Sequence, residues 1–169
     1  MLESKAIAFP TTIAAHPSLV LKFFSVFSRF EYALKRTSEF LMGDDTYAEA
    51  NWTKYVTSIR GRFAEISDRD FSEAVGYLLA HPPAKQVAMG GALRWKQSEQ
   101  GPGESKEAYA LRLVKTVRNN LFHGGKYPYP EGPVQDVARN RRLLRASVLV
   151  LKNCLALSPV VAAHYREAA

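Results

Sequence analysis

Hydrophobic residues recur three and four positions apart along most of the chain, which is the period of an amphipathic helix. The strongest such segment runs from residue 18 to residue 42 and is followed by Gly43, a natural left-handed helix cap. Further helices are predicted over residues 50–66, from Asp70 to Pro82, over 104–122 and from Pro133 to Pro159. Asp70 is the expected cap of its helix, with Glu73 reaching back. The pattern therefore predicts an all-α protein.

The predicted helices are joined by short connections, and no internal repeat or change of composition divides the chain. Residues 85–96 have a weak pattern because Gly90 and Gly91 disfavour a helix, and no strand pattern competes there. We expect one domain over residues 1–169, with an extended segment at 1–17 and a short tail at 159–169. The architecture is predicted as an antiparallel bundle of four main helices with short additional helices.

The net charge of +7 lies in one third of the chain. Between Lys106 and Lys152 there are ten Lys or Arg residues against three acidic residues, and the rest of the chain sums to zero. Such a block is typical of a protein that binds a polyanion, and equally of a solvated basic face. Charge alone leaves both interpretations open.

The single cysteine, Cys154, lies in an apolar run and is expected to pack in the core of a cytoplasmic protein. Residues 6–21 are uncharged but are interrupted by Pro10 and Pro17, so neither a signal peptide nor a membrane span is expected. Asp44 and Asp45 follow a predicted helix and are interpreted as the end and cap of that helix, not as a pair of metal ligands. No metal site is predicted, because the histidines outside 117–126 stand alone: His16, His81 and His164.

Polar residues crowd the end of the helix predicted over 104–122, where Arg118 and Asn119 are followed by His123. Asn119 and His123 are four positions apart and share a helix face. Arg118 lies on another face, so only its long side chain could bring the guanidinium close to them. A histidine in the last turn of a helix titrates near neutral pH, and a guanidinium binds phosphate in two-pronged fashion. Together they can cleave RNA through the substrate's own 2′-hydroxyl, without metal or cofactor.

The stretch from Arg118 to His123 resembles the signature of the HEPN domains (higher eukaryotes and prokaryotes nucleotide-binding), in which Arg and a polar residue precede His by a few positions. The resemblance implies a metal-independent endoribonuclease, often a toxin or a component of phage defence or RNA processing. It also implies a homodimer in which two motifs face one cleft, and a possible antitoxin or regulatory protein. Gly125 stands where toxins of one group carry a modifiable tyrosine, so regulation through that residue is not expected.

Other residues are candidates for supporting roles around the motif. Lys126 and Tyr127 follow it directly and are predicted to contact phosphate and to stack on bases. Arg141 and Arg145 share a face of the last long helix and are candidates for the RNA path. Glu31 interrupts an apolar stripe, so it either orients Arg118 or Asn119 or lies at the edge of the stripe and reaches water.

Two other kinds of function remain open. In the first, the same bundle binds a nucleotide, RNA or a partner protein through Arg118 and Lys126 without cleaving it. In the second, His123 is only a helix cap and Arg118 is a surface charge, so the protein is a structural helical protein without catalytic activity. The wide apolar surface of the first and last long helices supports the expected homodimer.

Overall fold

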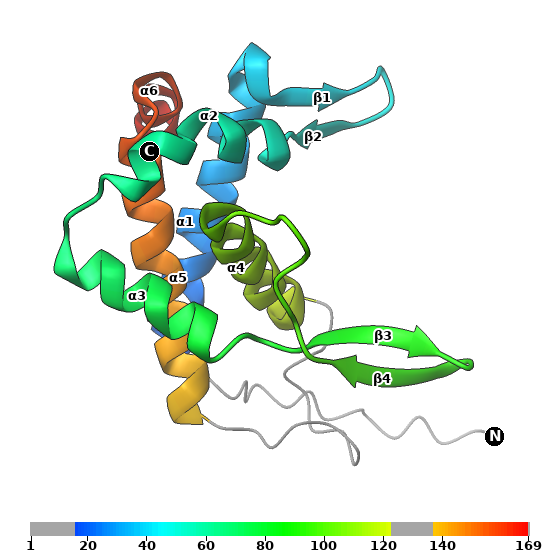
Figure 1. Ribbon diagram of the computed structural model, residues 1–169. Helices are drawn as coiled ribbons and strands as arrows, with labels where there is room; N and C mark the ends of the chain where they lie inside the picture. The colour runs from blue at the N-terminus through cyan, green and yellow to red at the C-terminus, as the bar shows by residue number, and fades with distance from the viewer. Residues whose placement is uncertain (1–15, 123–136, 169) are drawn as a thin grey trace.

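The computed structural model describes residues 16–122 and 137–168, and this part of the chain is mainly helical with two small antiparallel hairpins (Figure 1). The helices are α1 (Pro17–Arg36), a 3-10 turn η1 (Ser38–Phe40), α2 (Trp52–Ala64), α3 (Arg69–Ala80), α4 (Lys106–Phe122), α5 (Val137–Ala156) and α6 (Pro159–Glu167). The strands are β1 (Leu41–Gly43) with β2 (Ala48–Ala50), and β3 (Lys85–Met89) with β4 (Ala92–Lys96). The all-α prediction is thus correct for most of the chain and wrong for the hairpins.

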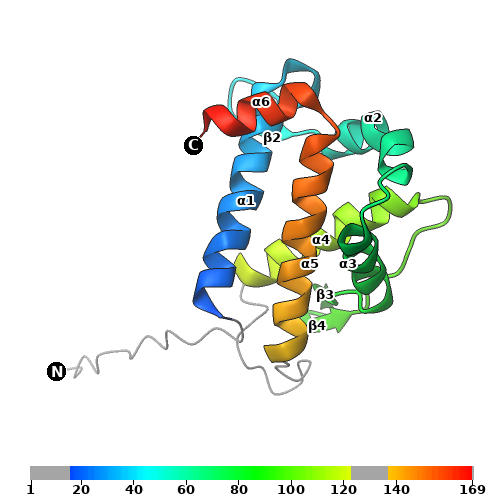
Figure 2. The same ribbon diagram turned by 90° about the vertical axis from the view of Figure 1, so that its left-hand side faces the viewer.

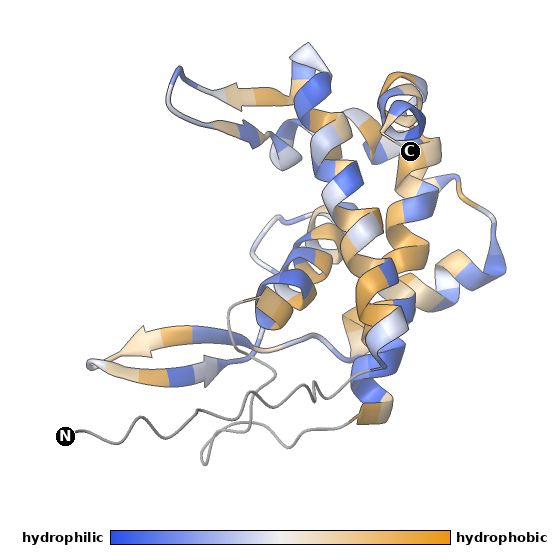
Figure 3. Ribbon diagram, turned by 180° about the vertical axis from the view of Figure 1, so that it is seen from behind, coloured by the Kyte–Doolittle hydropathy of each residue, from blue (hydrophilic) through white to orange (hydrophobic). Residues whose placement is uncertain are grey.

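The core forms where α5 packs between α1 and α3, while α6 crosses the end of α1 (Figure 2). Hydrophobic residues colour much of α1 and α5 where these two helices lie side by side (Figure 3). Cys154 is fully buried in this core, as expected. The apolar faces of α1 and α5 are therefore largely used inside the chain, while Leu21 and Phe24 of α1 and Val137 of α5 stay exposed. The expected homodimer remains a prediction.

Helix α1 ends at Arg36, six residues before the predicted end at residue 42. Thr37 adopts an extended backbone and its hydroxyl donates to the Ala33 carbonyl, which closes the helix. Phe40 then enters the core through the 3-10 turn, while Leu41 is half exposed on β1. Gly43 belongs to β1 and does not cap a helix. Its φ is 128°, and a Cβ atom at this position would clash with the Tyr47 carbonyl oxygen.

Residues 85–96, predicted without strands, form the β3–β4 hairpin. Met89 pairs with Ala92, so Gly90 and Gly91 make a two-residue turn with φ of 59° and 77°. Positive φ at both central residues defines the turn that matches the twist of a hairpin, and glycine adopts it without strain. The two glycines thus specify a hairpin rather than weaken a helix.

Two further boundaries differ from the predictions. Asp68, not Asp70, caps α3, because its side chain accepts a hydrogen bond from the Phe71 N–H at 2.6 Å. The predicted tail at 159–169 contains α6, whose first residue is Pro159, a residue well suited to the first turn of a helix. Val161 on α6 is fully buried, so this segment is part of the core.

Among the described helices, none is by itself long and apolar enough to cross a membrane. The pair α5 and α6 passes such a test only when both are counted together, and they are bent by 115° relative to each other. Most of the apolar residues of α5 are buried inside the protein.

We expect the Tyr55→Phe substitution to lower the free energy of unfolding by about 1–2 kcal/mol, because it removes one buried hydrogen bond. The Tyr55 hydroxyl is fully buried and donates to the Cys154 carbonyl at 2.6 Å, joining α2 to α5. Urea unfolding measures the change. The control is Tyr32→Phe, which alters an exposed ring. Equal effects of the two substitutions would contradict the prediction.

Candidate functional site

The motif helix α4 brings Arg118 against Glu31 on α1. The guanidinium Nη2 of Arg118 lies 3.6 Å from Oε2 of Glu31, and Nη1 donates to Oδ1 of Asn119 at 2.9 Å. The other carboxylate oxygen of Glu31 accepts a hydrogen bond from Nε1 of Trp52 at 3.2 Å. The expected contact between Glu31 and Arg118 is therefore present, and three elements meet at this carboxylate.

The Arg118 guanidinium also lies over aromatic rings. Its central carbon is 5.4 Å from the centroid of Phe27 and 5.9 Å from that of Phe122. The Phe24 and Phe122 rings contact each other with centroids 5.3 Å apart. Since a cation is attracted to the face of an aromatic ring, these contacts help to hold the guanidinium beside the two phenylalanines.

These residues surround an open pocket of about 290 Å³ between α1 and α4. Its lining consists of Phe24, Phe27, Ser28, Glu31, Arg118 and Phe122. Phe24 and Phe122 are 44% and 50% exposed, so the apolar wall of the pocket is open to solvent. The pocket thus combines a cation with exposed aromatic surface, a combination suited to a phosphate joined to a flat base.

The remaining motif candidates His123, Lys126 and Tyr127 lie outside the described residues, which stop at Phe122 and resume at Val137. The expected convergence of Arg118 and Asn119 on His123 therefore remains a prediction. Asn119 is exposed, while its neighbour Asn120 is buried. Asn120 donates through Nδ2 to the Ala84 carbonyl at 2.8 Å, which joins the end of α4 to the residue before β3. No role for Asn120 was predicted from the sequence.

The α5 arginines Arg141 and Arg145, candidates for the RNA path, do not line the Arg118 pocket. Arg145 lines a separate groove between α3 and α5, which shares no residue with that pocket. Asp70 and Glu73 line the same groove, so its cations lie among carboxylates. Arg141 is exposed and lines neither cavity. The placement of Arg145 is explained by the helical period, which turns that face of α5 toward α3.

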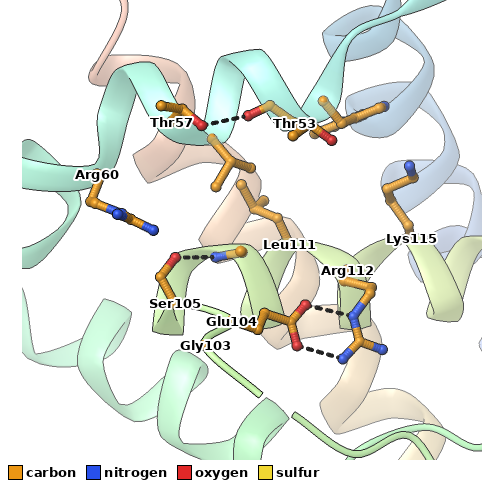
Figure 4. Close-up of a pocket in the computed structure, with 12 residues that line it drawn as sticks. Thr53, Thr57, Arg60, Gly103, Glu104, Ser105, Leu111, Arg112 and Lys115 are labelled. Carbon is orange, nitrogen blue, oxygen red and sulfur yellow. Dashed lines mark hydrogen bonds and ion pairs between the residues drawn. The ribbon is translucent and has the colours of Figure 1, made fainter. Parts of the chain in front are cut away.

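A second cavity of about 360 Å³ lies between α2 and α4 (Figure 4). It is rich in cations, but Arg112 binds Glu104 with two hydrogen bonds of 2.7 Å, and Arg60 binds Glu107 at 2.8 Å. Lys115 extends from α4 with its ammonium 5.8 Å from the Trp52 ring, and burial lowers its pKa. The two arginines of this cavity hold their carboxylates at 2.7–2.8 Å, whereas Arg118 lies 3.6 Å from Glu31. The guanidinium of Arg118 is therefore less tightly paired and better suited to binding phosphate.

Among residues 16–122 and 137–168, no three His, Cys, Asp or Glu side chains lie close enough together to hold a metal ion. Trp52 and Lys115 were not predicted as part of a site. The sequence places Trp52 at the start of a helix and Glu31 in the apolar stripe of another helix, and neither position specifies that the two side chains meet.

We predict that Glu104→Gln lowers the stability at pH 7 by about 1 kcal/mol, since it weakens a charge-assisted pair that is partly exposed. The hydrogen bonds from Arg112 hold the pKa of Glu104 below its ordinary value of 4.5. A carboxylate with a depressed pKa stabilises the fold above its unfolded pKa, and this stabilisation is lost as the pH falls through the folded pKa.

Thermal unfolding of both proteins between pH 7 and pH 3 measures this difference. It should shrink as the pH falls below about 4.5. The matched control is Glu39→Gln, which changes an exposed carboxylate. A difference in stability that stays constant from pH 7 to pH 3 would contradict an origin in the charge of Glu104.

Comparison with known proteins adds no identity. No family model matches the chain, and no curated protein or solved structure is similar to it.

Proposed function

We propose that this protein is a metal-independent endoribonuclease of the HEPN type. The observation that supports it is the Arg118 guanidinium, held by Glu31 and Asn119 at the edge of an open aromatic pocket. His123 follows directly after the last described residue of α4. A phosphate binder and a proton carrier thus stand five positions apart in the chain.

In the proposed reaction Arg118 binds the scissile phosphate and offsets the charge that builds on its oxygens. His123 exchanges protons with the substrate. The 2′-oxygen loses its proton and attacks phosphorus, and the bond from phosphorus to the 5′-oxygen breaks. The leaving 5′-oxygen takes up a proton, which gives a 2′,3′-cyclic phosphate and a 5′-hydroxyl. DNA lacks the nucleophile and is not a substrate.

The aromatic wall of the pocket supports a nucleic acid over a simple phosphate ester. Phe24 and Phe122 are exposed beside the guanidinium, and exposed rings next to a cation bind bases by stacking. Lys126 and Tyr127 complete the proposed contacts with the RNA backbone and bases. Within this proposal the four longer helices correspond to the antiparallel bundle of the family, and two copies place their motifs in one cleft.

The same proposal includes a cytoplasmic setting and control by an antitoxin or another regulatory protein. The buried single thiol of Cys154 is compatible with a reducing compartment. Toxin and defence roles follow from the resemblance to the family alone.

The second candidate function is a non-catalytic module that binds RNA, a nucleotide or a partner protein. One observation favours it: Glu31 already compensates the charge of Arg118, which reduces the field available to stabilise a developing negative charge. In this case the pocket holds its ligand by stacking and weak phosphate contact, and no bond is broken.

Incubation of a mixed RNA with the purified protein in EDTA separates the two functions. We expect cleavage by the wild type, with cyclic phosphate ends, and loss of cleavage in His123→Ala and Arg118→Ala. The matched control is Arg142→Ala, since Arg142 lies 4.1 Å over the Tyr77 ring in the separate groove. Binding of RNA without cleavage by any variant would support the module instead.

Glu31 is proposed as a positioning residue, and Glu31→Gln tests this role. The substitution keeps the shape of the side chain and removes the charge that fixes Arg118. We expect kcat to fall roughly 10-fold with little change in KM, because a misplaced phosphate binder weakens the transition state more than the bound substrate. Single-turnover cleavage with Glu39→Gln as control measures it. Faster cleavage in Glu31→Gln would show that the carboxylate restrains Arg118 instead of orienting it.

A further inference from the structure

The β3–β4 hairpin stands away from the helices and extends to the same side of the molecule as the β1–β2 hairpin (Figure 1). It carries three cationic residues, Lys85, Arg94 and Lys96, and their positions follow from the pairing of the two strands. Lys85 is directly opposite Lys96, and Val87 is directly opposite Arg94. Since opposite residues of an antiparallel pair share a face and alternate residues of a strand do too, all three cations lie on one face.

This arrangement is costly for the protein on its own. Like charges directly opposite each other destabilise a two-stranded ribbon, and no Asp or Glu occurs between residues 85 and 96. Lys85 and Lys96 are exposed, and among the described residues neither forms an ion pair with a carboxylate. A bound polyanion is the kind of partner that would offset this repulsion.

The root of the hairpin is fixed to the end of the motif helix. Asn120, two positions after Arg118, donates to the carbonyl of Ala84, the residue before Lys85. The other strand is held at its exit, where Ser98 donates to the Pro83 carbonyl at 2.6 Å and Gln97 donates to the Pro82 carbonyl at 2.9 Å. The Lys85 and Lys96 pair, which lies at this root, is thereby held beside the last turn of α4.

We propose that the face of the β3–β4 hairpin carrying Lys85 and Lys96 binds the phosphate backbone of RNA beside the last turn of α4, the helix that also carries Arg118. The inference rests on RNA being the ligand of the Arg118 pocket, as proposed above, and adds the surface that holds the strand beyond it. The β1–β2 hairpin carries only acidic charges, at Asp44, Asp45 and Glu49, so its field repels the same backbone. In this proposal the RNA backbone follows the β3–β4 hairpin and not the acidic β1–β2 hairpin.

The test measures binding separately from cleavage. Each protein carries His123→Ala, and fluorescence anisotropy follows a labelled single-stranded RNA at several salt concentrations. Lys85→Gln/Lys96→Gln is the hairpin variant. Lys54→Gln/Lys152→Gln is the control, because it removes the same charge from exposed positions on α2 and α5. Thermal unfolding of both variants confirms that they remain folded.

The hairpin variant is expected to bind RNA roughly 10-fold more weakly than the His123→Ala parent. Its plot of log K against log salt concentration should be less steep by about 1.4, the value for two lost single-strand phosphate contacts. The salt dependence of the control variant should stay steeper than that of the hairpin variant. Equal affinity and equal slope in the two variants would overturn the proposal, as would a parent that binds no RNA.

Sedimentation velocity without RNA adds a further outcome. If the hairpin variant changes the self-association of the protein but not its RNA affinity, the basic face pairs with a second copy, for example through the acidic β1–β2 hairpin, and the proposal is wrong. Failure of the nuclease activity gives a different result. In that case the wild type binds RNA through Lys85 and Lys96 and leaves it intact.

Discussion

The carboxylate of Glu31 is the interaction on which the candidate site depends. One oxygen accepts from Trp52 on α2 and the other faces Arg118 on α4, so a residue of α1 fixes groups on two other helices. A carboxylate in an apolar stripe carries a desolvation cost, which such contacts offset. Removing either partner leaves part of that charge uncompensated, whereas the full set holds Arg118 in one place.

The precision of this contact comes from the aromatic core. Trp52 stacks on Phe30 with centroids 5.3 Å apart and an interplanar angle of 8°, and it meets Tyr55 edge-on. Tyr55 is in turn tied to the Cys154 carbonyl on α5. Because interiors are close-packed, the direction of the Trp52 N–H is set by these neighbours. The order of causes runs from the core to Trp52, then to Glu31, and finally to the guanidinium.

The helices were predictable from their period, and the polar interruption of an apolar stripe marked Glu31 as a candidate partner of Arg118 or Asn119. The sequence could not decide between that pairing and a position at the edge of the stripe, and the structure shows the pairing with Arg118. The hairpins were not predictable, since short strands carry few alternating positions, and Gly90 with Gly91 fits a helix break as well as a turn. Asn120 and Trp52 were missed for another reason. Their partners, the Ala84 carbonyl and Glu31, are distant in sequence, and a hydrogen bond to a backbone carbonyl leaves no sequence pattern. The place of Arg145 required the packing of α3 on α5.

Charge shows most clearly how folding changes the meaning of a sequence pattern. The basic excess between Lys106 and Lys152 includes Arg112, which is held by Glu104, and Arg118, which is held by Glu31, so carboxylates outside this range compensate part of it. Lys85 and Lys96 belong to the part of the chain whose charges sum to zero, yet the register places them side by side without a carboxylate among the hairpin residues. Interaction energy depends on distance in space, and a charge count along the sequence does not contain it. The Lys85 and Lys96 pair is therefore a concentration of positive charge that a count along the sequence does not reveal.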